Sequence, residues 1–113
     1  KKEIIVNLGG DNISPTKIEN LLSLNEKIKQ SLVYGDKKTY LVALIVTDIY
    51  ENEKEIQLYI EKLNNNLSII EKIKKFKLIK QEFTIENGML TPTLKLKRKK
   101  ILEKYKEDLE KLY

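Results

Sequence analysis

The run Leu41-Val42-Ala43-Leu44-Ile45-Val46 contains no polar residue, and it predicts the centre of the fold. A strand covered on one face alternates apolar and polar residues, because successive side chains point to opposite faces. A strand covered on both faces is apolar throughout. We therefore predict a strand over residues 39–46, with other elements packed on both sides of its sheet.

A β-hairpin and a short helix are predicted near the start of the chain. Residues 4–8 have the composition of a strand, turn residues follow at 9–12, and the chain returns through Ile13. Ser14 is a favourable N-cap, and Pro15 is a favourable first helical residue because its φ already suits a helix. Apolar residues then recur three and four positions apart, which predicts one buried helical face at Ile18, Leu21 and Leu22.

Periodicity and turn chemistry predict the remaining elements. They are a strand at 31–35, a turn at 36–38, a helix at 51–67, a short helical piece at 69–73, a strand at 76–84 and a final helix with an apolar stripe at Ile101, Leu102, Tyr105, Leu109 and Leu112. The alternating glutamates and lysines of the final helix predict a solvated face with i,i+4 pairs. Together these elements predict a small α+β domain, with an N-terminal β-hairpin and a roughly three-stranded sheet packed against helices.

The composition excludes several classes of site. At 113 residues the chain is long enough for one domain with a modest core. It contains no cysteine and no histidine, which argues against a zinc site, a Ser-His or Cys-His nucleophile pair and a disulfide framework, so no metal site is predicted. A cysteine-free chain agrees with a reducing compartment, and a cytoplasmic location is expected. No apolar run approaches the roughly 20 residues that a membrane-spanning helix needs.

The net charge of +5 is concentrated in two basic clusters. The first is Lys72, Lys74, Lys75, Lys77 and Lys80, and the second is Lys95, Lys97, Arg98, Lys99 and Lys100. Such clusters are often solvated surface, but they also attract polyanions. A small basic nucleic-acid-binding α+β module is one alternative, although Phe76 is the single aromatic residue in the first cluster and base stacking needs more. A peripheral contact of the first cluster with an anionic membrane is another.

The strongest functional signal is the segment Asn87-Gly88-Met89-Leu90-Thr91-Pro92-Thr93-Leu94-Lys95-Leu96-Lys97-Arg98. Pro92 restricts its own φ and drives Thr91 toward an extended conformation. A polar turn precedes this stiff stretch, and a basic helix follows it. Lys95 is therefore expected on a stiff, exposed loop, from which a single positive charge can be delivered to a partner surface.

This segment resembles the lysine loop that closes the small C-terminal domain of AMP-forming acyl-CoA synthetases, the adenylate-forming superfamily. A second motif supports the resemblance, because residues 2–19 are similar to the segment that follows the interdomain hinge in that superfamily. There a short apolar strand turns through glycines and enters a helix at an Ile-x-Pro-x-x-Ile-Glu pattern, represented here by Ile13, Pro15, Ile18 and Glu19. The paired glycines and the Leu-Thr-Pro-Thr-x-Lys form resemble the long-chain fatty acid branch.

The resemblance spans essentially the whole chain. It implies that residues 1–113 are the mobile C-terminal lid domain of a long-chain fatty acid–CoA ligase, with the large N-terminal adenylation domain absent from this chain. The implied substrates are a fatty acid, ATP with Mg²⁺ and coenzyme A, bound mainly by that N-terminal domain. The isolated chain is accordingly expected to have no synthetase activity.

The resemblance also implies roles for individual residues. Lys95 would contact the carboxylate and the phosphate during adenylation, and the turn Gly9-Gly10-Asp11 would face coenzyme A in the second step. Lys2 lies beside the expected hinge. Many members of the superfamily have glycine immediately before the lysine, whereas this chain has Leu94. Lys97, two residues further on, is the alternative candidate for the catalytic lysine.

Overall fold

The central strand of the computed structural model, which describes residues 3–48 and 53–113, is β4 (Leu41–Val46). β3 (Gln30–Tyr34) pairs with β4 in the antiparallel direction and β5 (Ile73–Ile79) in the parallel direction, so the sheet order is β3-β4-β5. Every residue of β4 is buried, which confirms that the strand is covered on both faces.

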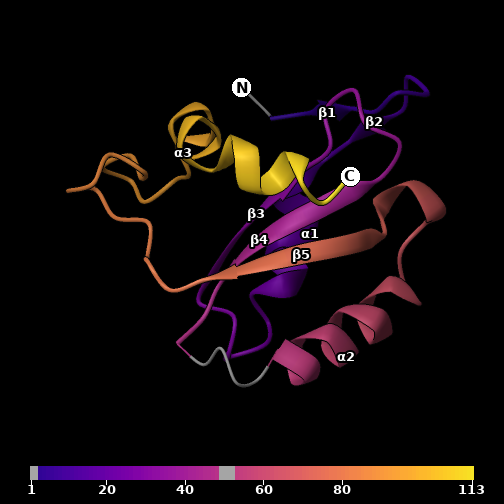
Figure 1. Ribbon diagram of the computed structural model, residues 1–113, viewed down its shortest axis with the longest axis horizontal. Helices are drawn as coiled ribbons and strands as arrows, with labels where there is room; N and C mark the ends of the chain where they lie inside the picture. The colour runs from indigo at the N-terminus through magenta and orange to yellow at the C-terminus, as the bar shows by residue number, and fades with distance from the viewer. Residues whose placement is uncertain (1–2, 49–52) are drawn as a thin grey trace.

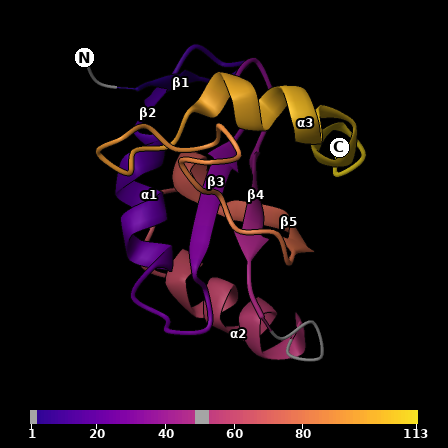
Figure 2. The same ribbon diagram turned by 90° about the vertical axis from the view of Figure 1, so that its left-hand side faces the viewer.

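Helices cover the two faces of this sheet (Figures 1 and 2). α1 (Pro15–Leu22) and α2 (Glu53–Asn64) pack on one face, and α3 (Arg98–Glu110) packs on the other. Alternate residues of β4 belong to the two cores because successive strand side chains point in opposite directions. The core under α1 and α2 takes Leu41, Ala43 and Ile45, and the core under α3 takes Val42, Leu44 and Val46. The predicted α+β class is confirmed.

A separate two-stranded hairpin consists of β1 (Ile5–Val6) and β2 (Asn12–Ile13), paired antiparallel. The strands are shorter than predicted because the turn closes early: the Asp11 N–H donates to the Asn7 side chain at 2.8 Å, and the Asn7 N–H donates to the Asp11 carbonyl at 3.1 Å. The helix start is as predicted. Ser14 is the N-cap, and its hydroxyl accepts the Lys17 N–H at 3.3 Å.

The third strand of the sheet begins earlier than the sequence indicates. The isoleucines after α2 predicted one helical piece through Ile73, but only a 3₁₀ turn, η2 (Ile69–Glu71), forms. Ile73 instead pairs with Leu41 at the start of β5. The Asn64 side chain fixes this start, since it accepts the Ile73 N–H at 3.0 Å and donates to the Ile73 carbonyl at 2.9 Å. Pairing with a distant strand therefore overrides the local helical pattern.

The same strand also ends earlier than predicted. β5 stops at Ile79, opposite the last residue of β4, so residues 80–84 lie outside the sheet. Phe83 is nevertheless buried in the α3-side core. Its backbone is bound by the Gln30 side chain at 2.7 Å and 2.9 Å. Phe83, which the sequence placed in the predicted strand, is therefore a loop residue that packs into the core.

α2 confirms the predicted helix within the part of the chain that the structure describes. Residues 51–52 lie outside the described residues, and the helix ends at Asn64 rather than at 67. Its buried residues are Ile56 and Ile60, with Tyr59 and Leu63 partly buried beside them. No helix of the described residues is long and apolar enough to cross a membrane.

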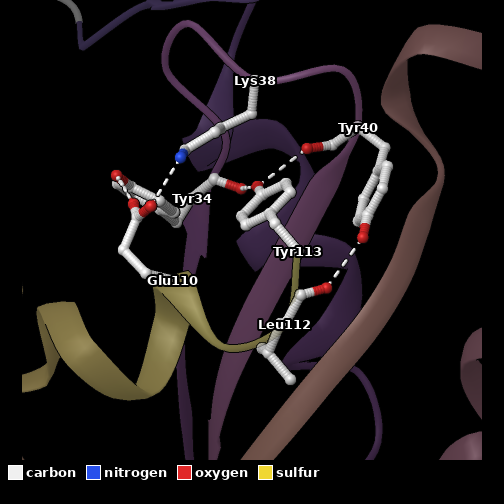
Figure 3. A network of polar contacts seen from close by, with 6 residues as sticks. All are labelled: Tyr34, Lys38, Tyr40, Glu110, Leu112 and Tyr113. Carbon is white, nitrogen blue, oxygen red and sulfur yellow. Dashed lines mark hydrogen bonds and ion pairs between the residues drawn. The ribbon is translucent and has the colours of Figure 1, made fainter.

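The end of α3 is attached to the β3–β4 turn by a polar network (Figure 3). Glu110 accepts hydrogen bonds from the Lys38 ammonium at 2.6 Å and from the Tyr34 hydroxyl at 2.8 Å. The Lys38 ammonium holds the pKa of Glu110 below its usual range, and burial together with Glu110 raises the pKa of Tyr34 to about 12. Tyr113 stacks on Tyr40 with ring centroids 4.7 Å apart and donates to its carbonyl at 2.8 Å.

Of the predicted i,i+4 pairs within α3, Lys106 and Glu110 attract each other, since Lys106 adds to the effect of Lys38 and Tyr34 in lowering the pKa of Glu110. Within the described residues, the ion pairs of α3 join it to other elements: Glu110 pairs with Lys38, Asp108 with Lys77, and Arg98 with Glu19. The charges therefore attach the helix to the rest of the domain, because partners from other elements lie within reach.

Candidate functional site

Lys95 lies in a short hairpin that joins the α3-side core to the start of α3. Leu90 and Leu96 form an antiparallel bridge across it, and the Thr91 N–H donates to the Lys95 carbonyl at 2.8 Å. The Leu94 N–H in turn donates to the Thr91 carbonyl at 2.8 Å. The predicted stiff loop is thus closed by backbone hydrogen bonds in addition to the restriction at Pro92.

The Thr-Pro-Thr residues also contribute side-chain hydrogen bonds. The Thr91 hydroxyl accepts the Lys95 N–H at 3.1 Å and lies 3.1 Å from the Thr93 hydroxyl. Lys95 itself is exposed, and its ammonium makes no hydrogen bond or ion pair with any residue that the structure describes. The hairpin therefore orders the backbone of Lys95 while leaving its charge available to a partner.

Leu94 adopts a backbone conformation that L residues rarely take. Its φ is +65°, and its side chain is 67% exposed. A left-handed conformation costs a residue with a Cβ about 1–2 kcal/mol, a cost that glycine avoids. The glycine that many members of the superfamily have before the lysine would fit this conformation, and Leu94 fits it under strain.

We expect Leu94→Gly to stabilise the domain by about 0.5–1 kcal/mol, because relief of the strain exceeds the additional flexibility that glycine gives the unfolded chain. Urea unfolding of the 113-residue chain measures the change. Leu94→Ala is the matched control, since it removes the same exposed side chain but keeps the unfavourable φ. A Leu94→Gly variant no more stable than Leu94→Ala would show that Leu94 is not strained.

The two sequence motifs meet at a bidentate ion pair between Arg98 and Glu19. Arg98 Nη1 donates to Glu19 Oε2 at 2.7 Å, and Nη2 donates to Oε1 at 2.7 Å. Glu19 Oε2 also accepts the backbone N–H of Val33 in β3 at 2.8 Å. The Arg98 side chain is 16% exposed and that of Glu19 is 9% exposed. One carboxylate therefore connects α1, the edge of the sheet and the residue that starts α3.

The sequence alone does not predict this contact. In the sequence Arg98 belongs to the second basic cluster, and Glu19 is the last position of the Ile-x-Pro-x-x-Ile-Glu pattern. The available signal was the place of Glu19 between Ile18 and Leu22 on the buried face of α1. A carboxylate is rarely buried without a partner, so its position indicates a cation somewhere in the chain.

An open groove of about 920 Å³ lies between the Lys95 hairpin and α1. Thr91, Leu94 and Lys95 line one side of it, and Ser14 and Lys17 line the other. In Figure 2 the segment between β5 and α3 is drawn in front of α1, and residues of both line this groove. Lys95 therefore lies at the rim of a concave surface.

The turn between β1 and β2 lies at the other end of the molecule from the Lys95 hairpin (Figure 1). Gly9, Gly10 and Asp11 are all exposed. Gly10 needs to be glycine for its own conformation, because its φ is +87°. Gly9 does not, because an added Cβ would meet no heavy atom closer than 3.6 Å. Lys2, predicted beside the hinge, lies outside the described residues.

The residues of the two basic clusters differ in their exposure and in their partners. Arg98 is paired, whereas Lys97 is exposed at the N-cap position of α3 without a side-chain capping bond. In the first cluster Lys74 and Lys75 are exposed on the edge strand β5, where lysines discourage pairing with other chains. Phe76 packs against the core under α1 and α2, so its ring is not presented for base stacking.

Comparison with known proteins agrees with the two motifs. The chain matches the AMP-binding enzyme C-terminal domain family over residues 2–113. It is 35% identical to the long-chain-fatty-acid–CoA ligase FadD15 of Mycobacterium tuberculosis and 30% identical to the long-chain-fatty-acid–CoA ligase 6 of Rattus norvegicus. Each alignment covers 100% of this chain, but only 23% and 20% of the respective relatives. The chain thus spans about a fifth of the length of these relatives.

Solved structures show the same arrangement. The A-PCP didomain of carboxylic acid reductase from Segniliparus rugosus, in complex with AMP, superposes with a TM-score of 0.85 at 27% identity, over 99% of this chain and 17% of that chain. The adenylation domain of a carboxylate reductase from Mycobacterium chelonae gives a TM-score of 0.85 at 27% identity over 97% of this chain and 19% of that chain. Motifs, fold and family match agree, and the chain belongs to the AMP-binding enzyme C-terminal domain family, as the C-terminal domain of an adenylate-forming enzyme.

Proposed function

We propose that this chain is the mobile C-terminal domain of a long-chain fatty acid–CoA ligase, which converts a fatty acid, ATP and coenzyme A into acyl-CoA, AMP and diphosphate. The observation that carries the proposal is the Lys95 hairpin, whose backbone is ordered while the Lys95 ammonium has no partner among the described residues. The two long-chain ligases at 35% and 30% identity support the substrate class. The N-terminal adenylation domain of the same polypeptide is the proposed partner.

Lys95 would act in the first half-reaction. The fatty acid carboxylate attacks the α-phosphorus of ATP, a bond forms between the carboxylate oxygen and that phosphorus, and the bond to diphosphate breaks. Both reactants are anions, so negative charge accumulates around the phosphorus in the transition state. A lysine ammonium aimed at the attacking and phosphoryl oxygens stabilises that charge as it develops. The exposed position of Lys95 at the rim of a groove suits such insertion into a partner domain.

The turn Gly9-Gly10-Asp11 would act in the second half-reaction. There the coenzyme A thiolate attacks the acyl carbonyl carbon, and the bond from that carbon to the phosphate oxygen of AMP breaks. The turn and the Lys95 hairpin lie at opposite ends of the domain, whose longest dimension is 36 Å (Figure 1). A single orientation cannot present both to one reaction centre, which supports rotation of the domain between the two steps. Lys2 remains the proposed hinge neighbour.

We expect Gly9→Ala to slow thioester formation about tenfold while leaving adenylation unchanged, because the added methyl group displaces a ligand that passes close to the backbone. The fold itself tolerates this methyl group, since its nearest neighbours would be side-chain oxygens 3.6 Å away. Steady-state assays of the two half-reactions in the full-length parent enzyme measure the effect. Equal rates for wild type and variant would remove Gly9 from the proposed coenzyme A path.

The substrate class is tested with the full-length parent enzyme and a panel of fatty acids from short to long chains. Diphosphate release and acyl-CoA formation are followed separately. The proposal predicts the highest kcat/KM with long-chain acids and requires ATP and coenzyme A for product. The 113-residue chain alone serves as the control and should form neither product. Turnover restricted to short or aromatic acids would contradict the long-chain assignment.

A further inference from the structure

We propose that Glu19 and Arg98 are positioning residues for Lys95: their ion pair fixes the Lys95 hairpin against α1 and the edge of the sheet. The inference rests on the proposed function where it concerns adenylation, since Lys95 must act there for its position to matter. Within this chain alone, the hairpin is ordered by a contact between residues 79 positions apart in the sequence.

The first support is connectivity. Within the described residues, the hydrogen bonds that connect the segment 85–98 to α1 all come from Arg98: two to Glu19 at 2.7 Å and one to Thr16 at 3.4 Å. Met89 and Leu90 seat the base of the hairpin in the α3-side core. Apolar packing of this kind is non-directional. The side of the hairpin toward α1 therefore depends on Arg98 for its orientation.

The second support is proximity along the chain. Arg98 is the first residue of α3, and it follows Lys95 by three positions. The Lys97 N–H closes the hairpin by donating to the Met89 carbonyl at 2.8 Å. A displacement of Arg98 is thus transmitted to Lys95 through a short, hydrogen-bonded length of backbone. A misplacement of about 1 Å at a reacting group can cost roughly 100-fold in rate.

The third support is the geometry of the pair. A guanidinium offers two parallel donors that match a carboxylate, whereas an ammonium is a single point charge. Here both donors are used, and the remaining capacity of Glu19 Oε2 accepts the Val33 N–H at 2.8 Å. The hydrogen bond from β3 therefore fixes the position of the carboxylate that binds Arg98. Arg98→Lys keeps the positive charge but loses the two parallel donors. This substitution therefore distinguishes the effect of the bidentate geometry from the effect of the charge.

The ordering of the hairpin is tested by amide hydrogen exchange on the 113-residue chain. In Arg98→Lys and in Glu19→Gln we expect the amides of Leu94, Lys95 and Lys97 to exchange about tenfold faster, because local opening of the hairpin becomes easier. The amides of β4 report on global stability, so the proposal predicts a larger acceleration at the hairpin amides than at those of β4. The matched control is Lys38→Met, which removes the ion pair at the other end of α3 and should leave the hairpin amides unchanged. Hairpin exchange unchanged in both test variants would overturn the proposal.

The effect on adenylation is tested in the full-length parent enzyme with the same variants. We expect the kcat of adenylation to fall about 10- to 100-fold, with KM for ATP and fatty acid and the rate of thioester formation nearly unchanged. The kcat of adenylation in the double variant should be no lower than that of the more impaired single variant, because both substitutions remove the same contact. Equal loss in both half-reactions would instead indicate a general structural role. If Lys95→Ala is silent in adenylation, the proposed function fails, while hydrogen exchange still decides whether Arg98 orders the hairpin.

Discussion

Lys95→Ala in the full-length parent enzyme is expected to slow adenylation by about 100- to 1000-fold, which is the usual effect of removing one group that stabilises transition-state charge. Thioester formation from pre-formed acyl-adenylate should stay within about twofold of wild type, because the rotated domain would hold Lys95 away from the reaction centre. The fold should be unaffected, since the Lys95 side chain is exposed and makes no hydrogen bond or ion pair within the described residues.

The two half-reactions are measured separately, the first by diphosphate release and the second by consumption of acyl-adenylate. Lys97→Ala is the matched control, because Lys97 is also exposed and makes no side-chain capping bond. A large adenylation defect in Lys97→Ala with a silent Lys95→Ala would move the catalytic role to Lys97. Normal adenylation in both variants would show that neither lysine has the proposed role.

Glu19→Ala is expected to have the largest effect on stability, a loss of about 3 kcal/mol in the free energy of unfolding. The substitution leaves the mostly buried guanidinium of Arg98 without its anion and removes the acceptor of the Val33 N–H. An unpaired buried charge and an unsatisfied backbone donor are both costly. Urea unfolding of the 113-residue chain, followed by far-UV circular dichroism, measures the loss.

The matched control for Glu19→Ala is Lys17→Met, which removes an ion pair of the same helix with Glu71 at 2.9 Å. The Lys17 side chain is 57% exposed, so this pair should contribute less than about 1 kcal/mol. If the two variants lose equal stability, the Glu19–Arg98 pair is an ordinary surface contact, and the proposed positioning of Lys95 loses its physical basis.

The strain at Leu94 and the ordering at Arg98 act on the same hairpin in opposite ways. Leu94 raises the energy of the folded hairpin through its φ of +65°, and the bidentate ion pair restrains its orientation. Strained residues persist where the surrounding structure determines their conformation. The hydrogen bonds of Thr91 and the anchoring of Arg98 supply that determination here.

Features that depend on neighbours in the sequence could be predicted from the sequence alone. The apolar run of β4, the glycine turn and the Ser14-Pro15 helix start each follow from the side-chain period or from the conformational limits of a single residue. The same is true of the exposed loop that carries Lys95, because proline and threonine restrict the backbone locally. The family resemblance also depended on these two local motifs, and the family match confirms it.

Features that depend on partners distant in the sequence were decided by the tertiary structure. The limits of β5 follow from its parallel register with β4, and Phe83 is buried although it lies outside the sheet. Glu19 and Arg98 meet across 79 positions because α1 and the start of α3 both reach the edge of β3. Local periodicity contains no information about which buried carboxylate will meet which arginine. Only the packing of helices on the two faces of the sheet brings that pair together and places the glycine turn and the Lys95 hairpin at opposite ends of the domain.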